Sequence, residues 1–147
     1  MSYVESNLTN NESVIYTAKM HWIVYLKGIG VLILGVLMVL TKDVRIMGLM
    51  VIVISIGFFF VAWLEVVTTE LAVTSKRIIA KIGFIRRNTI ELNHSKVESL
   101  SVNQTIMGRI LNYGTIVVNG TGGNRLPVAK ISNPLEFRRK SNIDDSN

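Results

Sequence analysis

The glycine-rich stretch IMGRILNYGTIVVNGTGG, residues 106–123, has the composition of a loop that could cradle phosphate. Such a loop requires the pattern G-x-x-x-x-G-K-[ST] between a strand and a helix. No lysine follows Gly123, and the next stretch, RLPVAKI, alternates as a strand does. We therefore expect the glycines of residues 120–124 to supply the positive φ angles of a hairpin turn, with no phosphate bound.

Upstream in the same stretch, the residues RILNY lie between two glycines. We expect Ile110, Leu111 and Tyr113 to pack beneath a sheet while Arg109 faces solvent. In this interpretation the segment is a turn and carries no chemistry.

Other catalytic or metal chemistry has little support. The chain has no cysteine, which excludes disulfides, thiolate metal sites and cysteine nucleophiles. The two histidines, His21 and His94, are far apart and lack the spacing that places two imidazoles on one helix face. We expect His94 to be a turn residue, and His21, just before Trp22, to be an anchor at a membrane boundary. The sequence therefore predicts no enzyme activity, no metal, no cofactor and no small-molecule substrate.

The remaining candidate site is basic. The chain has a formal charge of +6, and residues 65–147 hold twelve Lys and Arg against seven Asp and Glu. Two clusters, Arg86 with Arg87 and Arg138 with Arg139 and Lys140, are the candidate lipid-binding or partner-binding residues, because cations near a membrane attract anionic headgroups. The alternative is a solvated rim that serves topology and solubility. Nucleic acid is not an expected partner, because no recognition helix or aromatic RNA-binding motif is present.

Two apolar segments occupy the first half of the chain. WIVYLKGIGVLILGVLMVL, residues 22–40, contains one charge, Lys27, and IMGLMVIVISIGFFFVAWL, residues 46–64, contains none. A helix of this length spans about 28 Å, close to the hydrocarbon thickness of about 30 Å. A signal peptide would need a small-residue cleavage site, and a soluble hairpin would need an amphipathic stripe; the segments show neither. We therefore predict a transmembrane helical hairpin over residues 22–64.

Charge sets the expected orientation of this hairpin. The link, residues 41–45, holds two basic residues, whereas the flanks on the other side hold five. This excess favours a multi-pass membrane protein with both termini in the cytoplasm. Gly28 and Gly35 in the first helix, and Gly48 and Gly57 in the second, either let the helices approach closely or reflect how common glycine is in membrane helices.

From residue 65 the hydrophobic period becomes two, which is typical of strands. Six short strands are expected, near residues 70–75, 76–82, 85–92, 96–104, 114–120 and 125–131, the last at an edge or bulge because it contains Pro127. Their expected core is Leu71, Val73, Leu100, Val102, Ile116 and Val118.

A short helix should follow the strands. Asn133 is a suitable N-cap, Pro134 suits the first helical position, and Glu136 completes a capping box, which predicts a helix over residues 134–140. The predicted divisions are a lead-in (1–21), the hairpin (22–40 and 46–64), a β domain (65–140) and a polar tail (141–147). If the β domain owns this core, a fragment beginning near Val66 is expected to fold without detergent, with marginal stability because of its small size.

Three motifs give the chain a family resemblance. ELAVTSKRIIAKIGFIRR contains a T-x-x-R turn, Thr74 to Arg77, and a following glycine. ELNHSKVESLSVNQTIMGRILNYGTIVV contains Q-[ST]-x-x-G-[RK]-x-x-x-Y-G-T, and ISNPLEFRRK contains an N-P-x-x-F helix start. With these motifs the chain resembles the bacterial pleckstrin-homology-like (PH-like) domain family of small membrane proteins. IYTAKMHW, residues 15–22, also resembles the lead-in before their helices. The resemblance implies an antiparallel barrel or sheet closed by a C-terminal helix, which is short here.

These patterns together predict an α+β membrane protein, with a two-helix transmembrane hairpin before a PH-like antiparallel β domain. The expected function is that of a membrane-anchored binding or scaffold module without catalysis. Its expected ligand is a protein partner, a second copy of itself or anionic lipid headgroups. The alternative is a small pore-forming or transporter accessory subunit that oligomerises through the hairpin. Against a pore, the spans carry no polar stripe beyond Lys27 and Ser55.

Overall fold

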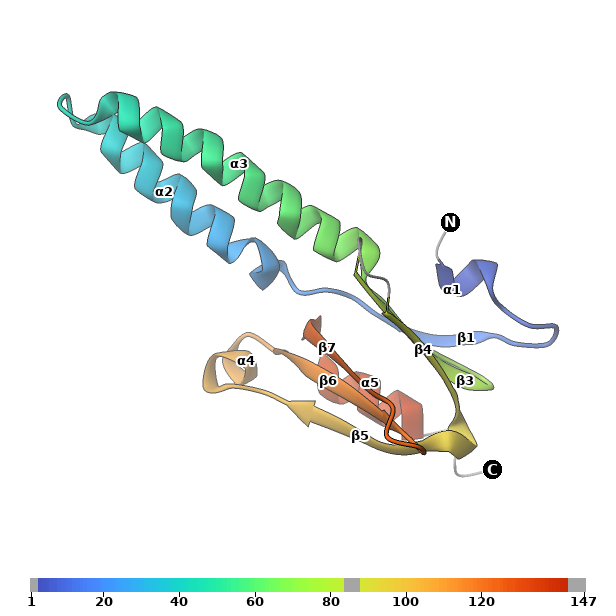
Figure 1. Cartoon of the computed structure of the whole chain (residues 1–147). Helices are drawn as coiled ribbons and strands as arrows, with labels where there is room; N and C mark the ends of the chain where they lie inside the picture. The colour runs from blue at the N-terminus through green and yellow to red at the C-terminus, as the bar shows by residue number, and fades with distance from the viewer. Residues whose placement is uncertain (1–2, 84–87, 143–147) are drawn as a thin grey trace. The chain divides into compact units, whose positions relative to one another are not determined.

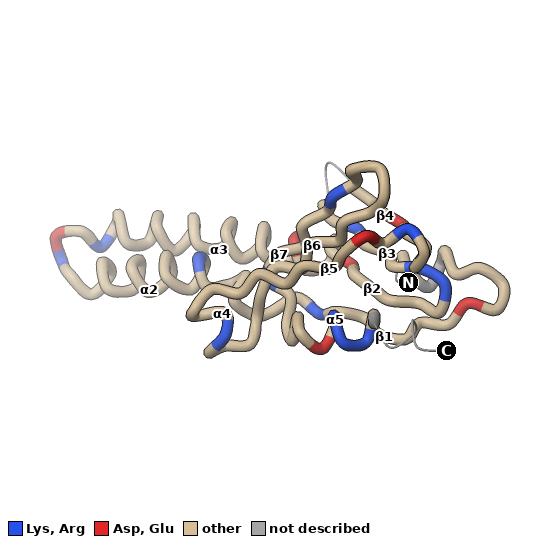
Figure 2. The backbone as a smooth tube through the Cα atoms, turned by 90° about the horizontal axis from the view of Figure 1, so that it is seen from below, with Lys and Arg blue, Asp and Glu red and all other residues tan. Residues whose placement is uncertain are grey.

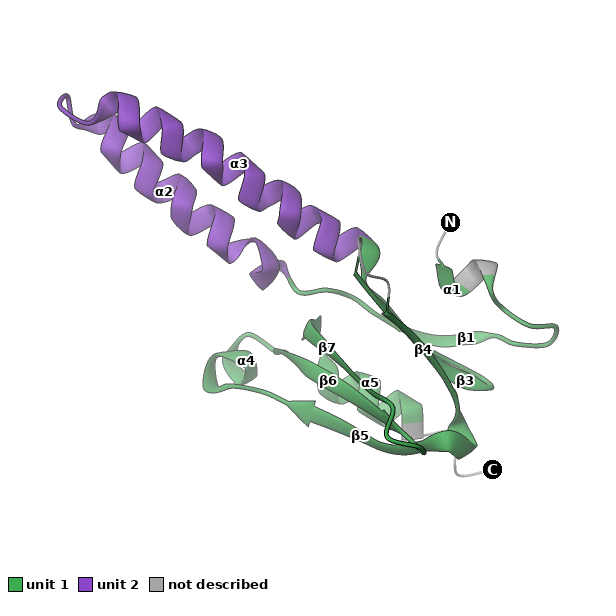
Figure 3. Cartoon of the chain, in the orientation of Figure 1, with its two compact units in different colours: residues 1–21, 68–147 green, residues 22–67 purple. Residues whose placement is uncertain are grey.

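The computed structural model describes residues 3–83 and 88–142, and the chain divides into two compact units (Figure 3). Residues 22–67 form a helical hairpin. Residues 1–21 and 68–147 together form the second unit, called here the β unit. The hairpin is therefore an insertion between two segments of one β structure.

The hairpin occupies the predicted apolar segments. It begins with a 3-10 turn, η1 (Trp22–Tyr25), continues as α2 (Leu26–Leu40) and returns as α3 (Arg45–Thr68) (Figure 1). Helix α3 continues past its predicted end at Leu64 to Thr68. Both helical segments are long and apolar enough to cross a membrane.

Two glycines let α2 and α3 cross at close range. A Cβ atom on Gly35 would lie 2.8 Å from Cγ1 of Ile52, and one on Gly48 would lie 2.7 Å from the backbone nitrogen of Val39. Both distances are too short for real atoms, so the crossing requires glycine at these two positions. A Cβ on Gly57 would meet nothing within 4 Å, so the crossing does not explain that glycine.

The β unit contains two antiparallel sheets (Figure 1). The first has the order β1 (Val14–Ala18), β2 (Glu70–Thr74), β3 (Arg77–Ile82) and β4 (Asn88–Asn93). The second has the order β5 (Val97–Asn103), β6 (Tyr113–Gly120) and β7 (Arg125–Ser132). A short turn, η2 (His94–Lys96), links them. The predicted α+β class is confirmed, and each sheet is a simple succession of neighbours apart from the inserted hairpin.

Strand β1 comes from the segment that the sequence analysis placed in a lead-in. It pairs with β2, with Ala18 opposite Leu71 and Thr17 opposite Ala72. Because β1 precedes the hairpin and β2 follows it, the chain leaves the sheet and returns to it at neighbouring positions. Hydrophobic alternation did not predict this strand, because it is five residues long and Ala18 alone is buried in it.

The core of the β unit uses residues from both sheets. The predicted core residues Leu71, Val73, Ile116 and Val118 are fully buried, and Leu100 and Val102 pack against them partly buried. Helix α5 (Pro134–Asn142) contacts β1, β2, β5 and β6. Its Phe137 is fully buried, with its ring edge-on to that of Tyr16 at 6.1 Å between centroids. One helix thus closes the core against strands of both sheets.

One predicted boundary changes at α5. The helix begins at Pro134 as expected but runs to Asn142, past the predicted end at Lys140. Asn133, the predicted N-cap, has a φ of 49°, and its side-chain oxygen accepts a hydrogen bond from the amide of Asn112. Asn133 therefore ties the helix start to the β5–β6 loop.

The turn after β6 confirms the predicted hairpin turn, although Gly120 is the last residue of β6 and does not have a positive φ. Gly122 and Gly123 have φ angles of 98° and 81°, and the chain enters β7 directly afterwards. β7 pairs with β6 at the margin of its sheet, with Pro127 opposite Val117, which is the predicted edge position. The residues 120–124 form a hairpin turn between strands, without the helix that a phosphate loop requires.

A short helix, α1 (Tyr3–Ser6), lies on the other face of the first sheet. Its Val4 is only 2% exposed and packs with Ala72 and Ile79, whose side chains alternate with those of the main core. The carboxylate of Glu70 accepts the backbone N–H groups of Tyr3 at 3.0 Å and Val4 at 3.1 Å. An acidic side chain thereby satisfies the first N–H groups of α1 and fixes it on β2.

Candidate functional site

The basic residues predicted as a binding site are described only in part. Arg86 and Arg87 lie outside the described residues. Arg138, Arg139 and Lys140 lie on α5, where Figure 2 shows a run of basic residues. Both arginines are exposed and Lys140 is half-buried. Consecutive residues of a helix point about 100° apart, so these three cations do not face one common surface.

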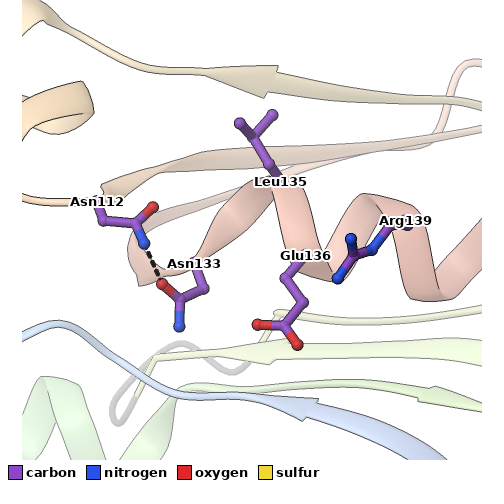
Figure 4. A pocket seen from close by; sticks show the side chains of 5 residues that line it. All are labelled: Asn112, Asn133, Leu135, Glu136 and Arg139. Carbon is purple, nitrogen blue, oxygen red and sulfur yellow. Dashed lines mark hydrogen bonds between the residues drawn. The ribbon is translucent and has the colours of Figure 1, made fainter.

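Arg139 also lines an open depression at the start of α5 (Figure 4). The other lining residues are Asn112, Asn133, Leu135 and Glu136. The described lining thus offers one carboxylate, one guanidinium and two amides, without a hydroxyl, thiol or imidazole that could act as a nucleophile beside them. Such a surface is suited to polar binding and provides no catalytic pair.

A charged network joins the N-terminal segment to the turn between β2 and β3. The buried carboxylate of Glu12 accepts two hydrogen bonds from Arg77, from Nε at 3.0 Å and from Nη2 at 3.1 Å. The hydroxyl of Thr74 donates to the same carboxylate at 2.6 Å and accepts the backbone N–H of Arg77 at 3.0 Å. Arg77 also donates to Glu91 at 2.7 Å and to the backbone oxygen of Asn7 at 2.6 Å. The T-x-x-R turn therefore positions an arginine that holds residues 7–12 on the sheet.

This network sets the charge of Glu12. Burial by itself raises the pKa of the carboxyl, but hydrogen bonds from Thr74, Thr9 and Arg77 outweigh burial and lower the pKa from 4.5 to about 2. The hydrogen bond to Glu12 raises the pKa of Arg77 in turn, although burial opposes it. Both groups are charged at neutral pH and compensate one another, so the network acts as a structural clamp.

The Q-T-x-x-G-R motif builds the loop between β5 and β6. Gln104 donates its side-chain amide to the backbone oxygens of Gly108 at 3.3 Å and Tyr113 at 3.1 Å. Thr105 caps the short helix α4 (Ile106–Ile110) by accepting the backbone N–H of Gly108 at 3.0 Å. A Cβ atom on Gly108 would lie 2.6 Å from the oxygen of Tyr113, so the loop admits no side chain there. The motif specifies one loop conformation.

Helix α4 presents apolar side chains to solvent. Ile106, Met107 and Ile110 are 79%, 57% and 71% exposed. The prediction that Ile110 packs beneath the sheet is wrong, whereas Arg109 is exposed as predicted. The reason is helical geometry: Ile106 and Ile110 are one turn apart and share a face, while Gly108 takes the buried side.

The histidines have packing roles within the β unit. His21 is buried, its ring lies 5.2 Å from that of Tyr113, and its backbone N–H donates to the oxygen of Lys130 at 2.7 Å. His94 begins η2, as predicted for a turn residue, and its Nε2 lies 2.9 Å from the oxygen of Thr74. Within residues 3–83 and 88–142, His, Cys, Asp and Glu side chains form no group of three that could hold a metal ion.

Comparison with known proteins identifies the family. The model of the family described as the bacterial PH domain matches residues 23–143. The chain belongs to the bacterial PH domain family. No curated protein and no solved structure matches it. The matched residues of this bacterial PH domain include the hairpin and the β unit from β2 through α5.

Membership of the bacterial PH domain family confirms the resemblance predicted from the sequence and indicates a binding or scaffold module. In this bacterial PH domain the matching motifs have structural roles. Thr74 and Arg77 hold the N-terminal segment, while Gln104 and Gly108 shape the α4 loop. The motifs therefore identify the framework of the domain and leave its ligand open.

Glu12, the buried acid of the clamp, was not predicted from the sequence. It is a single acidic residue in a polar segment, 65 positions before its partner Arg77, and no local pattern marks it. The available signal is indirect: an arginine fixed by a conformationally specific turn requires an acidic partner when it is removed from water. The T-x-x-R turn thus predicts an acidic partner for Arg77 without specifying its position in the sequence.

Proposed function

We propose that this bacterial PH domain protein is a membrane-anchored binding module without catalytic activity. In this proposal α2 and α3 span the membrane, and both termini and the β unit lie in the cytoplasm. One observation carries the anchoring: the outer surfaces of both helices are apolar. Leu40 and Ile46 are each 73% exposed, and Val53 is 67% exposed. Water would have to solvate this surface at about 25 cal/mol per Å² of apolar area, whereas a bilayer would cover it.

Two independent features support the orientation. Strand β1 precedes α2 and strand β2 follows α3, yet they pair in one sheet, so both ends of the hairpin must lie on the same side of a membrane. The flanks at those ends carry more Lys and Arg than the link of residues 41–45, which favours the cytoplasm for the flanks.

A pair of reporter fusions tests anchoring and orientation together. We expect a reporter active only in the cytoplasm to work after Asn147, and a reporter active only in the periplasm to work inside the link of residues 41–45. The protein should also remain in the membrane pellet at alkaline pH, where peripheral proteins are released. A periplasm-active fusion after Asn147 would reverse the orientation, and release into the supernatant would refute the anchor.

For the ligand, we favour a protein partner or a second copy over anionic headgroups. In this proposal the tether already brings the β unit to the membrane, so the basic residues of α5 need not bind headgroups to place it there. The described cations of α5 point in different directions, which does not suit one flat anionic surface. The absence of a nucleophile–base pair from the described depression at Arg139 agrees with a binding role.

Charge reversal on α5 tests this preference. If Arg138 and Arg139 contacted headgroups, each would contribute about 1 kcal/mol, and the double change to Glu would weaken anionic-lipid binding by one to two decades. We expect instead that the full chain, extracted with its surrounding lipid, carries the same lipid composition before and after Arg138→Glu with Arg139→Glu. Enrichment of anionic lipid that is lost in the double variant, and lost at 1 M salt, would show headgroup binding.

The pore alternative has less support. Ser55, the polar residue in the middle of α3, is fully buried, and its hydroxyl donates to the backbone oxygen of Ile52 at 2.6 Å. Lys27 is the second residue of α2, where its side chain can reach the headgroups. Neither residue supplies a polar lining along a span.

A further inference from the structure

We propose that α4 is a second membrane contact, in which Ile106, Met107 and Ile110 insert into the boundary between headgroups and acyl chains. This inference rests on the proposed function, because it requires α2 and α3 to cross that membrane. The contact would fix how the β unit is held above the bilayer, a property that the hairpin tether alone does not set.

The first observation is the surface of α4 itself. Its three apolar side chains are more than half exposed and lie on one face, because Ile110 follows Ile106 by four positions and Met107 by three. Arg109 is exposed beside them. Apolar side chains with a neighbouring cation are the composition that short interfacial helices use, with the cation among the headgroups.

The second observation is that this exposure is built into the loop. Gln104 bonds to two backbone oxygens across the loop, Thr105 caps α4, and Gly108 lies against the backbone of Tyr113 without room for a Cβ. These contacts hold α4 in one conformation with its apolar face outward. A loosely held loop could turn its isoleucines inward, but this loop is constrained not to.

The third observation is the position of α4 within the β unit. Its loop ends at Tyr113, the first residue of β6, and the ring of Tyr113 lies 5.2 Å from that of His21. Met20 bridges to Ile131 in β7, and the hairpin begins at Trp22, directly after His21. The apolar face of α4 therefore belongs to the end of the β unit from which the chain passes into the predicted span.

The opposite end of β6 provides a contrast. The turn of residues 121–124, TGGN, is exposed and contains no apolar side chain larger than the methyl group of Thr121. β6 has eight residues, so at about 3.4 Å per residue its two ends lie about 25 Å apart. Between the two ends of β6, the end next to α4 thus carries exposed large apolar side chains and the TGGN turn carries none.

Two arguments favour lipid over a protein on this face. A stable protein interface uses about 20 to 30 residues on each side, and α4 offers three apolar side chains. Interfacial insertion needs no such area, because the hairpin already holds the chain at the bilayer and removes most of the entropy cost of binding. Because Trp22 follows His21 directly, the end of the β unit that contains His21 stays close to the start of the predicted span.

The absence of cysteine makes a direct test possible. Single-cysteine variants of the full chain, Ile106→Cys and Ile110→Cys, carry a fluorophore and are reconstituted in vesicles at fewer than one chain per vesicle. Thr121→Cys is the matched control at the other end of β6, and Ile33→Cys reports the middle of α2. All four sites are exposed in the chain, so the substitutions should not disturb packing.

The measurement is the loss of fluorescence when the vesicles contain lipids with a quencher on the acyl chain. We expect quenching at Ile106, Ile110 and Ile33, and none at Thr121. Quenching at Ile33 but not at Ile106 and Ile110 would overturn the α4 contact and leave the anchor intact. No quenching at Ile33 would overturn the proposed anchor and the α4 contact with it. Shielding of Ile106 from an aqueous quencher without lipid quenching would indicate a protein contact and would also overturn the inference.

Discussion

A β unit in which a short glycine–serine linker joins residue 21 to residue 68 should fold without detergent, whereas the fragment of residues 66–147 should not. The fragment lacks β1, so it exposes the edge of β2 and loses buried Ala18 and the contact of Tyr16 with Phe137. It also lacks Glu12, the buried partner of Arg77. These losses amount to several kcal/mol in a domain whose total stability is about 5–15 kcal/mol. A fragment beginning near Val66 therefore lacks part of the buried core, Ala18.

The geometry of the sheet makes the junction feasible. Residues 21 and 68 each lie three positions beyond a directly opposed pair, Ala18 and Leu71. A flexible linker of about ten glycine and serine residues has ends about 17 Å apart on average, which is enough to close this gap.

Thermal unfolding in detergent-free buffer measures the result, with a cooperative transition expected for the joined unit. The matched control keeps the same junction but replaces residues 14–18 by a glycine–serine sequence of equal length, and it should show no cooperative transition. Cooperative melting of the 66–147 fragment, or of that control, would show that β1 is dispensable.

Replacing Glu12 by Gln should lower the stability of the β unit by about 3 kcal/mol at neutral pH, since the pKa of Glu12 is about 2 in the folded chain and 4.5 without its partners. The folded pKa lies below the unfolded one, so the contribution is complete above pH 4.5. It is lost as the pH falls from 4.5 through about 2. The difference between the native chain and Glu12→Gln should therefore shrink across that window.

Hydrogen exchange of the β2 and β3 amides in the detergent-solubilised chain gives the opening free energies. Glu91→Gln is the matched control, because Glu91 also pairs with Arg77 but its side chain is 31% exposed. Solvent screening limits that ion pair to about 1 kcal/mol or less. A Glu12→Gln difference that stays constant from pH 7 to pH 2 would mean that Glu12 acts through packing and not through its charge.

The parts of the fold that local patterns specify could be predicted. The apolar run from Trp22 to Leu40 predicts a long apolar helix, and the alternation through Ile116 and Val118 predicts a strand with a buried face. The glycine-rich turn was also predictable, because Gly122 and Gly123 lead straight into another strand.

The parts of the fold that depend on partners far away in the sequence could not be predicted. β1 is short and mostly exposed, and its pairing with β2 is a contact across the whole hairpin. The clamp has the same character, since nothing near Glu12 in sequence indicates Arg77. Ile110 was assigned to the core because it lies between two glycines in an apolar stretch. In the structure Thr105 caps a short helix, and this helix points the side chain of Ile110 toward solvent.

The pairing of β1 with β2 has a consequence for biosynthesis. β1 leaves the ribosome before the hairpin, and its partner strand leaves after it, so the first sheet cannot close until both helices have been made. In a membrane, closure also requires that the second helix return to the starting side. A chain in which α3 failed to insert would leave β1 and β2 on opposite sides of the membrane. Each strand would then have an edge with unpaired backbone N–H and C=O groups. We therefore expect closure of the first sheet to require that both ends of the hairpin lie on the same side of a membrane, and a chain that failed to close it would expose two strand edges that promote aggregation.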